Sequence, residues 1–557
     1  MKRLFSYAHW PLLTVLMLSG SQFRPETSLI PDGPALPYAP VCGETHVGGI
    51  PRSLLTQSVA LRTGLGATSI PTSTTNPQAQ AYFEQGMAYL HGYSLVEAAR
   101  SFHEALRHDP TLAMAQVGLN RVYIQADDFG AARKAAEAAR SLEKDVSERE
   151  KVHIALRFAQ QTAVESPKNG ALLDNYRNQL EEATRRFPDD AELWLLAGNA
   201  QERVATGRGQ GSSKKGIEIY ETILKTTEHP AAHHYLIHAY EGIGEYEKAK
   251  AHGAAYARLS PRLAHAQHMY AHDLMKTGEV EEAIFKLTTA DSLERQLYLS
   301  DNYKAEFDWH HSHNISVLAL CYQYQGRMQE AEALAREKFH MPRPVSPERT
   351  FYNRMSLPEL LIAQRREAEA LPLTETMQRA KTPGERLMGH FFEGIIHLKT
   401  NDLAQARASL KASEAEMDVV REKHPTGWMI SWLEPYPEYL SALIALTDPA
   451  TRDKGMKSVR AFQQKAHKQF GPDPWIEALF QLETIADLAY QLQLTDLFEE
   501  SAKLLAAHDP AYPGTHLALA RLADGKGDRA TAEREWFLAG QGWAKADEPF
   551  AAQRLKN

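Results

Sequence analysis

The sequence predicts an all-α protein, a right-handed superhelical solenoid of helix hairpins in which some units are irregular. At 557 residues the chain is too long for one compact core. Small and aromatic residues recur in phase at intervals of 34 residues, which is typical of paired helices. Because each hairpin leaves an apolar face that only a neighbouring hairpin can bury, such units stack into an extended array.

The N-terminal residues have the pattern of a secretory signal. Lys2 and Arg3 precede an apolar run near residues 10–18, and small residues follow it up to Ser21. The run is too short for a comfortable membrane span. We therefore expect a signal peptide over residues 1–21 and an exported protein, periplasmic if the source is a Gram-negative bacterium, with no stable membrane insertion after cleavage. The alternative is an uncleaved N-terminal anchor.

Residues 22–76 are rich in Pro, Gly, Ser and Thr, and this composition predicts a flexible tether. The chain has two cysteines, Cys42 in this segment and Cys321, so no disulfide framework is expected. Only one histidine lies near Cys42, and this favours an inert or bridged cysteine over a reactive thiol.

The clearest repeat is "AYFEQGMAYLHGYSLVEAARSFHEALRHDP", which ends at Pro110. Small residues at Gly86 and Ala98 let its two helices approach, Phe102 fills the space against the next unit, and Pro110 ends the second helix. The stretch resembles a tetratricopeptide repeat (TPR) over its whole length. The signature positions of that family fall, in order, on Tyr82, Gly86, Tyr89, Ala98, Phe102, Ala105 and Pro110.

Other units match the repeat less closely. Ala249 and Ala283, 34 residues apart, hold the same repeat position in two further units. "SEREKVHIALRFAQQ" and "PEYLSALIALTD" are helical but match poorly, and "TGRGQGSSKKG" is typical of a flexible loop between helices. We expect a TPR array over residues 77–345 and a TPR-like helical array over residues 346–557. Through "HPAAHHYLIHAY" and the first repeat, the first half of the chain also resembles exported bacterial TPR proteins of no assigned activity.

Histidines are concentrated in "HPAAHHYLIHAYE" and "LAHAQHMYAHDLM", where the pair His234/His238 recurs as His268/His272 after 34 residues. In TPR proteins, fixed positions of the first helix line a concave groove where peptides bind. The phase set by Ala249 and Ala283, and by Ala331 for the next repeat, carries these groove positions onto seven residues. They are His234, His238, Glu241, His265, His268, His272 and His313.

Two interpretations of this predicted groove remain open. Residues four apart lie on one face of a helix, and neutral imidazoles bind zinc, copper or nickel. His234, His238, His268 and His272 are therefore candidate ligands of one transition ion, with Glu241 or Asp273 as a carboxylate that orients a ring. Alternatively, the histidines contact a peptide or small ligand, or they only hydrogen-bond neighbouring helices. His310 and His311, in "FDWHHSHN", are expected in a solvated turn.

Composition and the absence of known motifs argue against several classes of function. A net charge of −8 and a pI near 6.3 argue against binding nucleic acid. No nucleophile elbow, phosphate-binding loop or CxxC motif is present, and "HEALRH" lacks the second zinc-protease histidine, since Arg107 stands there. The leading hypothesis is a non-enzymatic exported scaffold that binds a protein or peptide partner through its concave groove. The alternative is a transition-metal-binding or metal-dependent protein that uses the histidine cluster.

Overall fold

The computed structural model describes residues 46–47, 49–202, 205–343, 347–423, 428–468 and 472–555. The predicted all-α solenoid with a TPR-type fold is confirmed. Apart from one short antiparallel pair, β1 (His46–Val47) and β2 (Ile50–Pro51), the regular elements in these ranges are helices. The expected signal peptide, residues 1–21, and Cys42 lie outside the described residues.

The first half of the chain contains thirteen α-helices and two short 3₁₀ helices in the described ranges. They are α1 (Arg52–Leu55), α2 (Pro77–His91), α3 (Leu95–His108), α4 (Ala113–Gln125), α5 (Phe129–Ser141), η1 (Glu143–Asp145), α6 (Glu148–Glu165), α7 (Gly170–Arg186), α8 (Ala191–Asn199), α9 (Lys214–Leu224), α10 (Pro230–Glu241), α11 (Tyr246–Leu259), α12 (Ala264–Lys276), α13 (Val280–Asp301) and η2 (Ala305–Phe307).

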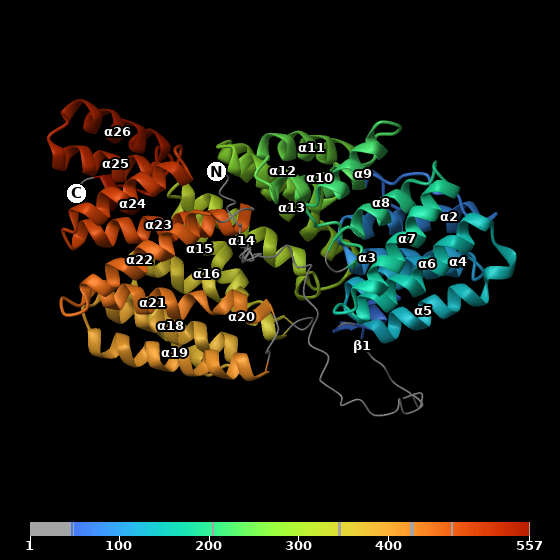
Figure 1. Ribbon diagram of the computed structural model, residues 1–557, viewed down its shortest axis with the longest axis horizontal. Coiled ribbons are helices and arrows are strands. Elements are labelled where there is room, and N and C mark those ends of the chain that lie inside the picture. The colour runs from blue at the N-terminus through green and yellow to red at the C-terminus, as the bar shows by residue number, and fades with distance from the viewer. Residues whose placement is uncertain are drawn as a thin grey trace, which may run out of the picture.

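The second half continues in the same alternation of packed helices (Figure 1). Its elements are α14 (Trp309–Tyr324), α15 (Met328–His340), η3 (Pro347–Arg349), α16 (Thr350–Ala363), α17 (Glu367–Gln378), α18 (Pro383–Lys399), α19 (Leu403–Lys423), α20 (Trp428–Leu433), α21 (Pro435–Thr447), α22 (Arg452–His467), α23 (Pro472–Gln491), α24 (Thr495–His508), α25 (Pro513–Lys526), α26 (Arg529–Gly542) and α27 (Glu548–Leu555).

Close contacts at small residues hold each hairpin together, as the repeat pattern predicts. The buried ring of Phe102 on α3 packs between Gly86 on α2 and Gly118 on α4, and a Cβ added at either glycine would lie within 2.6 Å of that ring. Gly198 faces Tyr220 in the same way. The absence of a side chain at these positions therefore sets how closely neighbouring helices approach.

Most of the hairpin turns share one backbone conformation. In many of them, the residue two positions before the second helix has a left-handed backbone, which favours glycine but is filled by several residue types here. These residues are Tyr93, Asp127, Gly244, Gly278, Gly326, Arg365, Asn401, Gln493 and Gly527. The pairs α6/α7, α8/α9 and α21/α22 lack this turn. The pairs α6/α7 and α21/α22 contain the stretches that match the repeat poorly, and α8/α9 contains the glycine-rich loop, so these are the irregular units.

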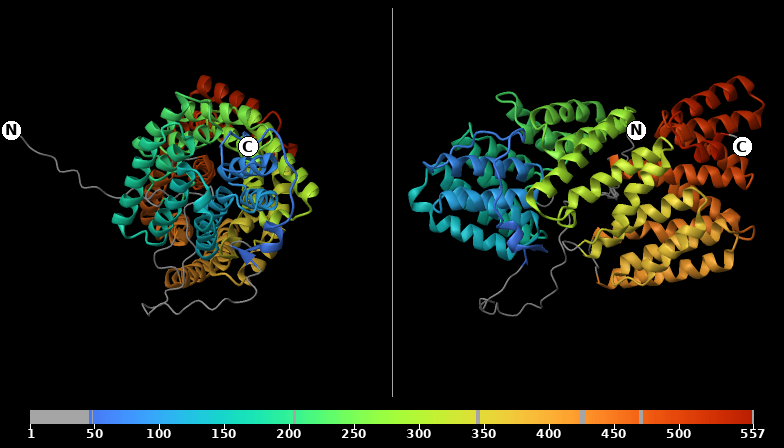
Figure 2. Two further views of the ribbon diagram at one scale, coloured as in Figure 1. Left: turned by 90° about the vertical axis from the view of Figure 1, so that its right-hand side faces the viewer. Right: turned by 180° about the vertical axis from the view of Figure 1, so that it is seen from behind.

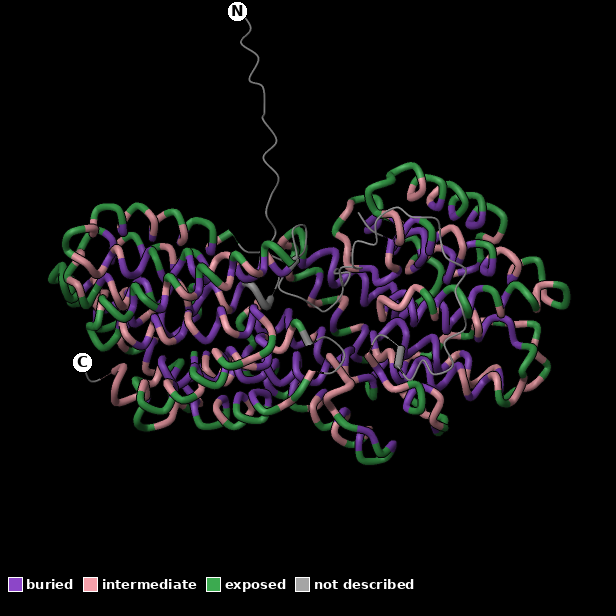
Figure 3. The backbone as a smooth tube through the Cα atoms, turned by 90° about the horizontal axis from the view of Figure 1, so that it is seen from below, coloured by how far each residue is buried: buried purple, intermediate pink, exposed green. Residues whose placement is uncertain are grey.

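Two large apolar cores divide the molecule into lobes, and a third, smaller core lies among α6, α7 and α8. One large core spans residues 50–303 and the other spans residues 271–550, so they overlap in sequence at α12 and α13. The sequence-based boundary at residue 345 instead falls inside the second core. On α12, Ala266 and Met269 belong to the first core, whereas Leu274 belongs to the second. One helix therefore serves both lobes. The buried stretches run through both lobes and the connection between them, with exposed residues along the outer edges (Figure 3).

The N-terminal lobe closes on itself instead of extending as an open array. The His91 ring, at the end of α2, lies 2.7 Å from the Tyr235 hydroxyl on α10. Arg100 on α3 donates to the carboxylate of Asp301 at the end of α13, at 2.6 Å. The first hairpin therefore contacts helices that follow it by more than a hundred residues, and Figure 2 shows the helices winding around a common axis.

The C-terminal lobe closes similarly. The Tyr324 hydroxyl, on α14, donates to Asp509 at 2.9 Å, and the Trp543 indole donates to the Tyr324 carbonyl at 3.1 Å. The last hairpins of the chain thus pack against α14, which lies in the middle of the sequence. Within the described ranges, no helix has the length and apolar character needed to cross a lipid bilayer.

Residues 49–76, named the strap here, lie in the range that composition predicts to be a flexible tether. In the structure they pack against the N-terminal lobe. Ile50, Leu55 and Leu65 are buried in its core. Arg100 donates to the Ser58 carbonyl at 2.7 Å. Composition does not reveal such packing, because a few apolar side chains and backbone hydrogen bonds are enough to order a segment otherwise rich in polar and turn-forming residues.

Substitution of Gly86 by alanine should destabilise the first hairpin by about 1–3 kcal/mol, because Phe102 is held on both sides and cannot retreat from the added Cβ. Gly540→Ala is the matched control, because nothing lies within 4 Å of a Cβ there and alanine favours helix. Chemical denaturation followed by circular dichroism measures both. Equal stability of the two variants would contradict the packing described here.

Candidate metal centre

Helices α10, α12 and α14 bring all seven predicted groove residues together, because α10 packs on α12 and α12 packs on α14. α10 begins at Pro230, where the His229 ring accepts a hydrogen bond from the Ala231 N–H at 3.2 Å. The histidines that follow recur three or four residues apart, so they share one helix face. His234, His238 and Glu241 lie on α10, His265, His268 and His272 on α12, and His313 on α14.

These seven side chains lie inside the protein instead of on an accessible concave surface. None is more than 8% exposed, and His234 and His268 are 0% exposed. The closure of the N-terminal lobe covers them, because Tyr93, in the first hairpin turn, places its ring against His234 and His265, with centroids 4.7 and 4.9 Å apart. Repeat phase predicts which face a residue occupies but not whether another part of the chain covers that face.

The histidines form two groups. His234, His238 and His265, named the first trio, each offer one ring nitrogen, and these nitrogens lie within 4.8 Å of one another. His268, His272 and His313, named the second trio, do the same. The four histidines predicted to bind one ion are therefore divided between the two trios. The first trio is completed by His265 from α12 and the second by His313 from α14.

The first trio directs three Nε2 atoms at one point. His265 Nε2 lies 2.9 Å and His238 Nε2 lies 3.2 Å from His234 Nε2. His234 Nδ1 lies 2.7 Å from the His91 carbonyl, which can only accept, so Nδ1 carries the proton of the neutral ring. His234 Nε2 is then a bare lone pair that faces two other ring nitrogens.

A buried network fixes the position of His91 and hence of His234. The His91 ring contacts the Tyr235 hydroxyl and lies 2.8 Å from Glu192, whose second oxygen accepts from Arg121 at 2.8 Å. Burial would raise the pKa of Glu192, but His91 and Arg121 outweigh it and lower that pKa well below its ordinary value. The carboxylate is therefore ionised and holds α2 and α4 against α8, while the Tyr235 hydroxyl links His91 to α10.

Glu241 connects the two trios. One carboxylate oxygen lies 3.5 Å from His238 Nδ1 and the other lies 3.6 Å from His272 Nδ1. Burial would raise the pKa of Glu241, yet these two histidines lower it overall. The carboxylate is therefore ionised and turns the Nδ1 edge of one ring in each trio toward itself. Asp273, the other predicted carboxylate, has no hydrogen-bond partner among the described residues and does not orient a ring.

His310 and His311 are buried in the first turn of α14, contrary to the expected solvated turn. His310 hydrogen-bonds Glu294 through Nδ1, and its ring centroid lies 4.9 Å from His265 and 4.7 Å from His268. His310 is therefore a histidine of the centre that repeat phase did not identify. The α14 helix starts earlier than expected, because Asp308 caps it by accepting from the His310 N–H at 2.9 Å.

A third cluster, Asp291, Glu294 and His311, has ligand atoms equally close together but different chemistry. Burial opposes protonation of His311, yet hydrogen bonds to Glu294 and Glu337 raise its pKa to about 10. Arg295 also pairs with Asp291 and Glu337. A protonated imidazole offers no lone pair to a metal, so this cluster is an ion-pair network.

Four histidines of the trios, by contrast, are held in the neutral form that metals require. Burial, and then the neighbouring histidines, lower the pKa of His234, His265, His268 and His313 well below the ordinary value. Neutral imidazoles bind a cation without first releasing a proton. Tyr256 stacks on His234 with centroids 5.0 Å apart and contributes to the dry, aromatic surroundings.

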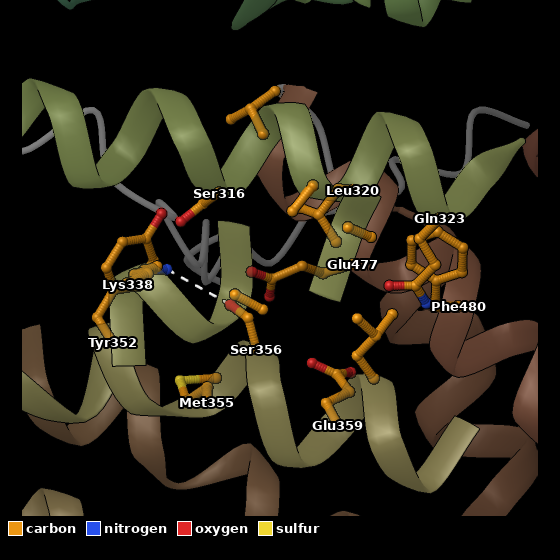
Figure 4. Close-up of a pocket in the computed structure, with 15 residues that line it drawn as sticks. Ser316, Leu320, Gln323, Lys338, Tyr352, Met355, Ser356, Glu359, Glu477 and Phe480 are labelled. Atoms are coloured by element: carbon orange, nitrogen blue, oxygen red, sulfur yellow. Dashed lines mark hydrogen bonds between the residues drawn. The ribbon is translucent and has the colours of Figure 1, made fainter. Parts of the chain in front are cut away.

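A small cavity lies in the C-terminal lobe between α14, α15, α16 and α23 (Figure 4). Its volume of about 40 Å³ is enough for a few water molecules. Side chains from α14, α15, α16 and α23 face it, including Lys338, whose ammonium donates to the Ser356 hydroxyl at 3.5 Å. Tyr352 lines the cavity, and its hydroxyl lies 3.2 Å from His313 Nδ1. The cavity therefore reaches the partners of the second trio.

Several residues of the centre have no sequence signal. His91, Tyr93 and Tyr352 come from other repeats, and the His91 carbonyl meets a side chain 143 residues later. Glu294 lies on α13, outside the groove positions. Glu294 is a partner of His310, and because the sequence placed His310 in a turn, it gave no signal for Glu294.

No known protein-family model matches the chain, and no curated protein matches it. Several solved structures are similar in overall path. The Cut9–Hcn1 assembly of the APC/C is 12% identical, covers 86% of this chain and 96% of that chain, and gives a TM-score of 0.31. Human IFIT1 with PPP-AAAA is 10% identical, with coverages of 78% and 91% and a TM-score of 0.37. Yeast Tom70 is 12% identical, with coverages of 86% and 97% and a TM-score of 0.33. Likenesses this weak carry no argument about the site.

In the metal-free protein, stability should fall as the pH drops below about 6.5. His234, His265, His268 and His313 have lowered pKa values and stay neutral in the folded state, whereas the unfolded chain takes up protons. Each such histidine then lowers the free energy of unfolding by about 1.4 kcal/mol per pH unit. His311 acts oppositely, because its raised pKa stabilises the fold below that pKa and this contribution is lost as the pH rises toward about 10.

Thermal denaturation of chelator-treated protein across the acidic range measures this effect. The variant His234→Gln should show a shallower loss of stability than the wild type, because one neutral buried histidine is removed. Unchanged melting temperatures between neutral pH and pH about 5 would contradict the assignment of neutral histidines.

Proposed function

We propose that this protein binds a first-row transition-metal ion at the first trio. The observation that carries the proposal is the pairing of His234 and His238. His234 directs Nδ1 toward the His91 carbonyl and so presents a bare Nε2, and His238, whose Nδ1 lies 3.5 Å from Glu241, places its Nε2 3.2 Å from that lone pair. A cation between the two nitrogens would be bound by both rings.

The spacing of the nitrogens fits coordination. Two imidazole nitrogens at 2.0–2.1 Å from a tetrahedral ion lie about 3.3 Å apart. The separations of 2.9 and 3.2 Å to His265 and His238 are close to this value. Hydrogen bonding alone satisfies the trio less well. If His265 Nε2 donates to His234, then His238 Nε2 still faces a nitrogen that has no proton to give.

The donor set selects the class of ion. Neutral imidazoles suit zinc, copper and nickel, whereas magnesium and calcium require oxygen ligands. The contacts of the other ring nitrogen, Nδ1, also fit a metal site. A histidine that binds a metal commonly donates its remaining N–H to a carbonyl or carboxylate. His234 donates to the His91 carbonyl and His238 faces Glu241, so both orientations are fixed before an ion arrives.

A peptide bound directly to the seven predicted groove residues is less well supported. Peptide recognition requires an accessible surface, and none of these side chains is more than 8% exposed. A partner would have to displace Tyr93 and open the N-terminal lobe. If the protein also acts as an exported scaffold, its partner therefore binds a different part of the surface.

Untagged full-length protein loaded with zinc, copper or nickel should retain at least one tightly bound ion by elemental analysis after excess ion is removed. The double variant His234→Gln/His265→Gln should lose the ion of the first trio. His508→Gln is the matched control, since this buried histidine hydrogen-bonds the Trp475 carbonyl far from the trio and should leave the metal content unchanged.

The decisive outcome concerns the first trio alone. Equal metal content in the wild type and the double variant, with both folded by circular dichroism, would rule out an ion at His234, His238 and His265. Cobalt substitution gives an independent check, since a nitrogen-coordinated tetrahedral cobalt ion absorbs strongly in the visible range and the variant should lose part of that absorption.

A further inference from the structure

We infer that the second trio, supported by His310, binds a second transition-metal ion, so that the buried histidines form a two-ion centre. This inference rests on the proposed function of the first trio. Neither the repeat pattern nor the first trio requires a second ion. The arrangement of His268, His272 and His313 supports it independently.

The outer edge of each ring in the second trio faces a partner that leaves Nε2 directed inward. His268 Nδ1 lies 2.9 Å from Asn314 Oδ1, His272 Nδ1 lies 3.6 Å from Glu241, and His313 Nδ1 lies 3.2 Å from the Tyr352 hydroxyl. Three kinds of partner, an amide, a carboxylate and a phenol, therefore hold three imidazoles in one orientation. Such outer contacts are the usual support of metal-ligating histidines.

Asn314 determines which nitrogen of His268 carries the proton. The Asn314 amide N–H₂ donates to the Leu287 carbonyl at 3.1 Å, so its Oδ1 must face His268. Oδ1 only accepts, and His268 Nδ1 therefore donates. His268 Nε2 is left as a lone pair with no hydrogen-bond partner among the described residues, although the side chain is 0% exposed. A buried lone pair of this kind is costly unless a cation occupies the site.

His310 borders the second trio. Its Nδ1 is held by Glu294, and its Nε2 has no hydrogen-bond partner among the described residues. Its ring centroid lies 4.7 Å from that of His268 and 4.9 Å from that of His265, so it stands between the two trios. The second trio itself supplies three imidazole ligands, and His310 supports the site from beside it.

The two ions would lie side by side. His265 and His268, one from each trio, are three residues apart on α12, and their ring centroids are 5.9 Å apart. Two cations this close repel each other in a buried site unless anions lie nearby. Glu241 contacts a ring of each trio, and Glu294 holds His310. These two carboxylates supply negative charge beside the pair of ions.

The cavity of Figure 4 is separated from His313 of the second trio by Tyr352. It reaches Tyr352, whose hydroxyl contacts His313, whereas the first trio is covered by Tyr93 and Tyr256. The second site should therefore exchange its ion faster than the first. A chelator added to loaded protein should remove one ion in an early phase and the other in a late phase.

Zinc titration of untagged, chelator-treated full-length protein tests the inference. Wild type should bind two ions per chain by elemental analysis. His268→Gln/His313→Gln should bind one, and His234→Gln/His265→Gln should also bind one, because each double variant removes one site. His310→Gln should keep the first ion and weaken the second by about tenfold or more.

The possible outcomes separate the two proposals. One ion in the wild type, retained in His268→Gln/His313→Gln and lost in His234→Gln/His265→Gln, would overturn the second ion and keep the first. Loss only in His268→Gln/His313→Gln would support the second trio and overturn the first. No ion in the wild type would overturn both. Because wild-type stoichiometry alone distinguishes one ion from two, the inference stays testable even if a variant fails to fold.

Discussion

Imidazole nitrogens that leave water must each find a partner, and this requirement organises the middle of the molecule. A hydrogen-bond donor or acceptor that is buried without a partner lowers the stability of the fold by about 1–3 kcal/mol. The chain meets the requirement on the outer edges of the rings with a backbone carbonyl at His91, a carboxylate at Glu241 and an amide at Asn314. The inner edges are left facing one another, and their chemistry is that of ligands.

The partners of the first trio depend on closure of the N-terminal lobe, which brings His91 and Tyr93 of the first hairpin against α10. Tyr352, a partner of the second trio, comes from α16 in the hairpin that follows α14. The α12 helix belongs to both lobes, and its histidines accordingly divide between the two trios. An open array would have left the same histidines on a hydrated groove, where water would satisfy every nitrogen.

The fold could be predicted from sequence because its signals are local. Gly86, Ala98 and Phe102 stand at spacings that only close hairpin packing explains, and Phe102 does fill the space between two glycines. The 34-residue offset between His234 and His268 likewise indicated that neighbouring helices would present these side chains together. Periodicity carries this information because a repeat imposes the same geometry on each unit.

The division into trios and the burial of the centre could not be predicted in this way. Both depend on contacts between residues far apart in the chain, such as His234 with His91, and no periodic pattern encodes which distant turn will cover a helix. His310 was missed for a different reason. The insertion before α14 interrupts the repeat phase, and the cap at Asp308 starts the helix earlier than the phase suggests.

The closure of both lobes has a consequence for how the protein is made. In an open solenoid each repeat is stabilised by its immediate neighbours, so folding can follow synthesis unit by unit. Here the first hairpin finds its full set of contacts only after Asp301 has been synthesised, and the second trio is incomplete until His313 and Tyr352 have been added. Such distant pairings slow folding, because the chain must lose loop entropy before the contacts form. In the proposed two-ion centre, the second site is therefore completed later in synthesis than the first.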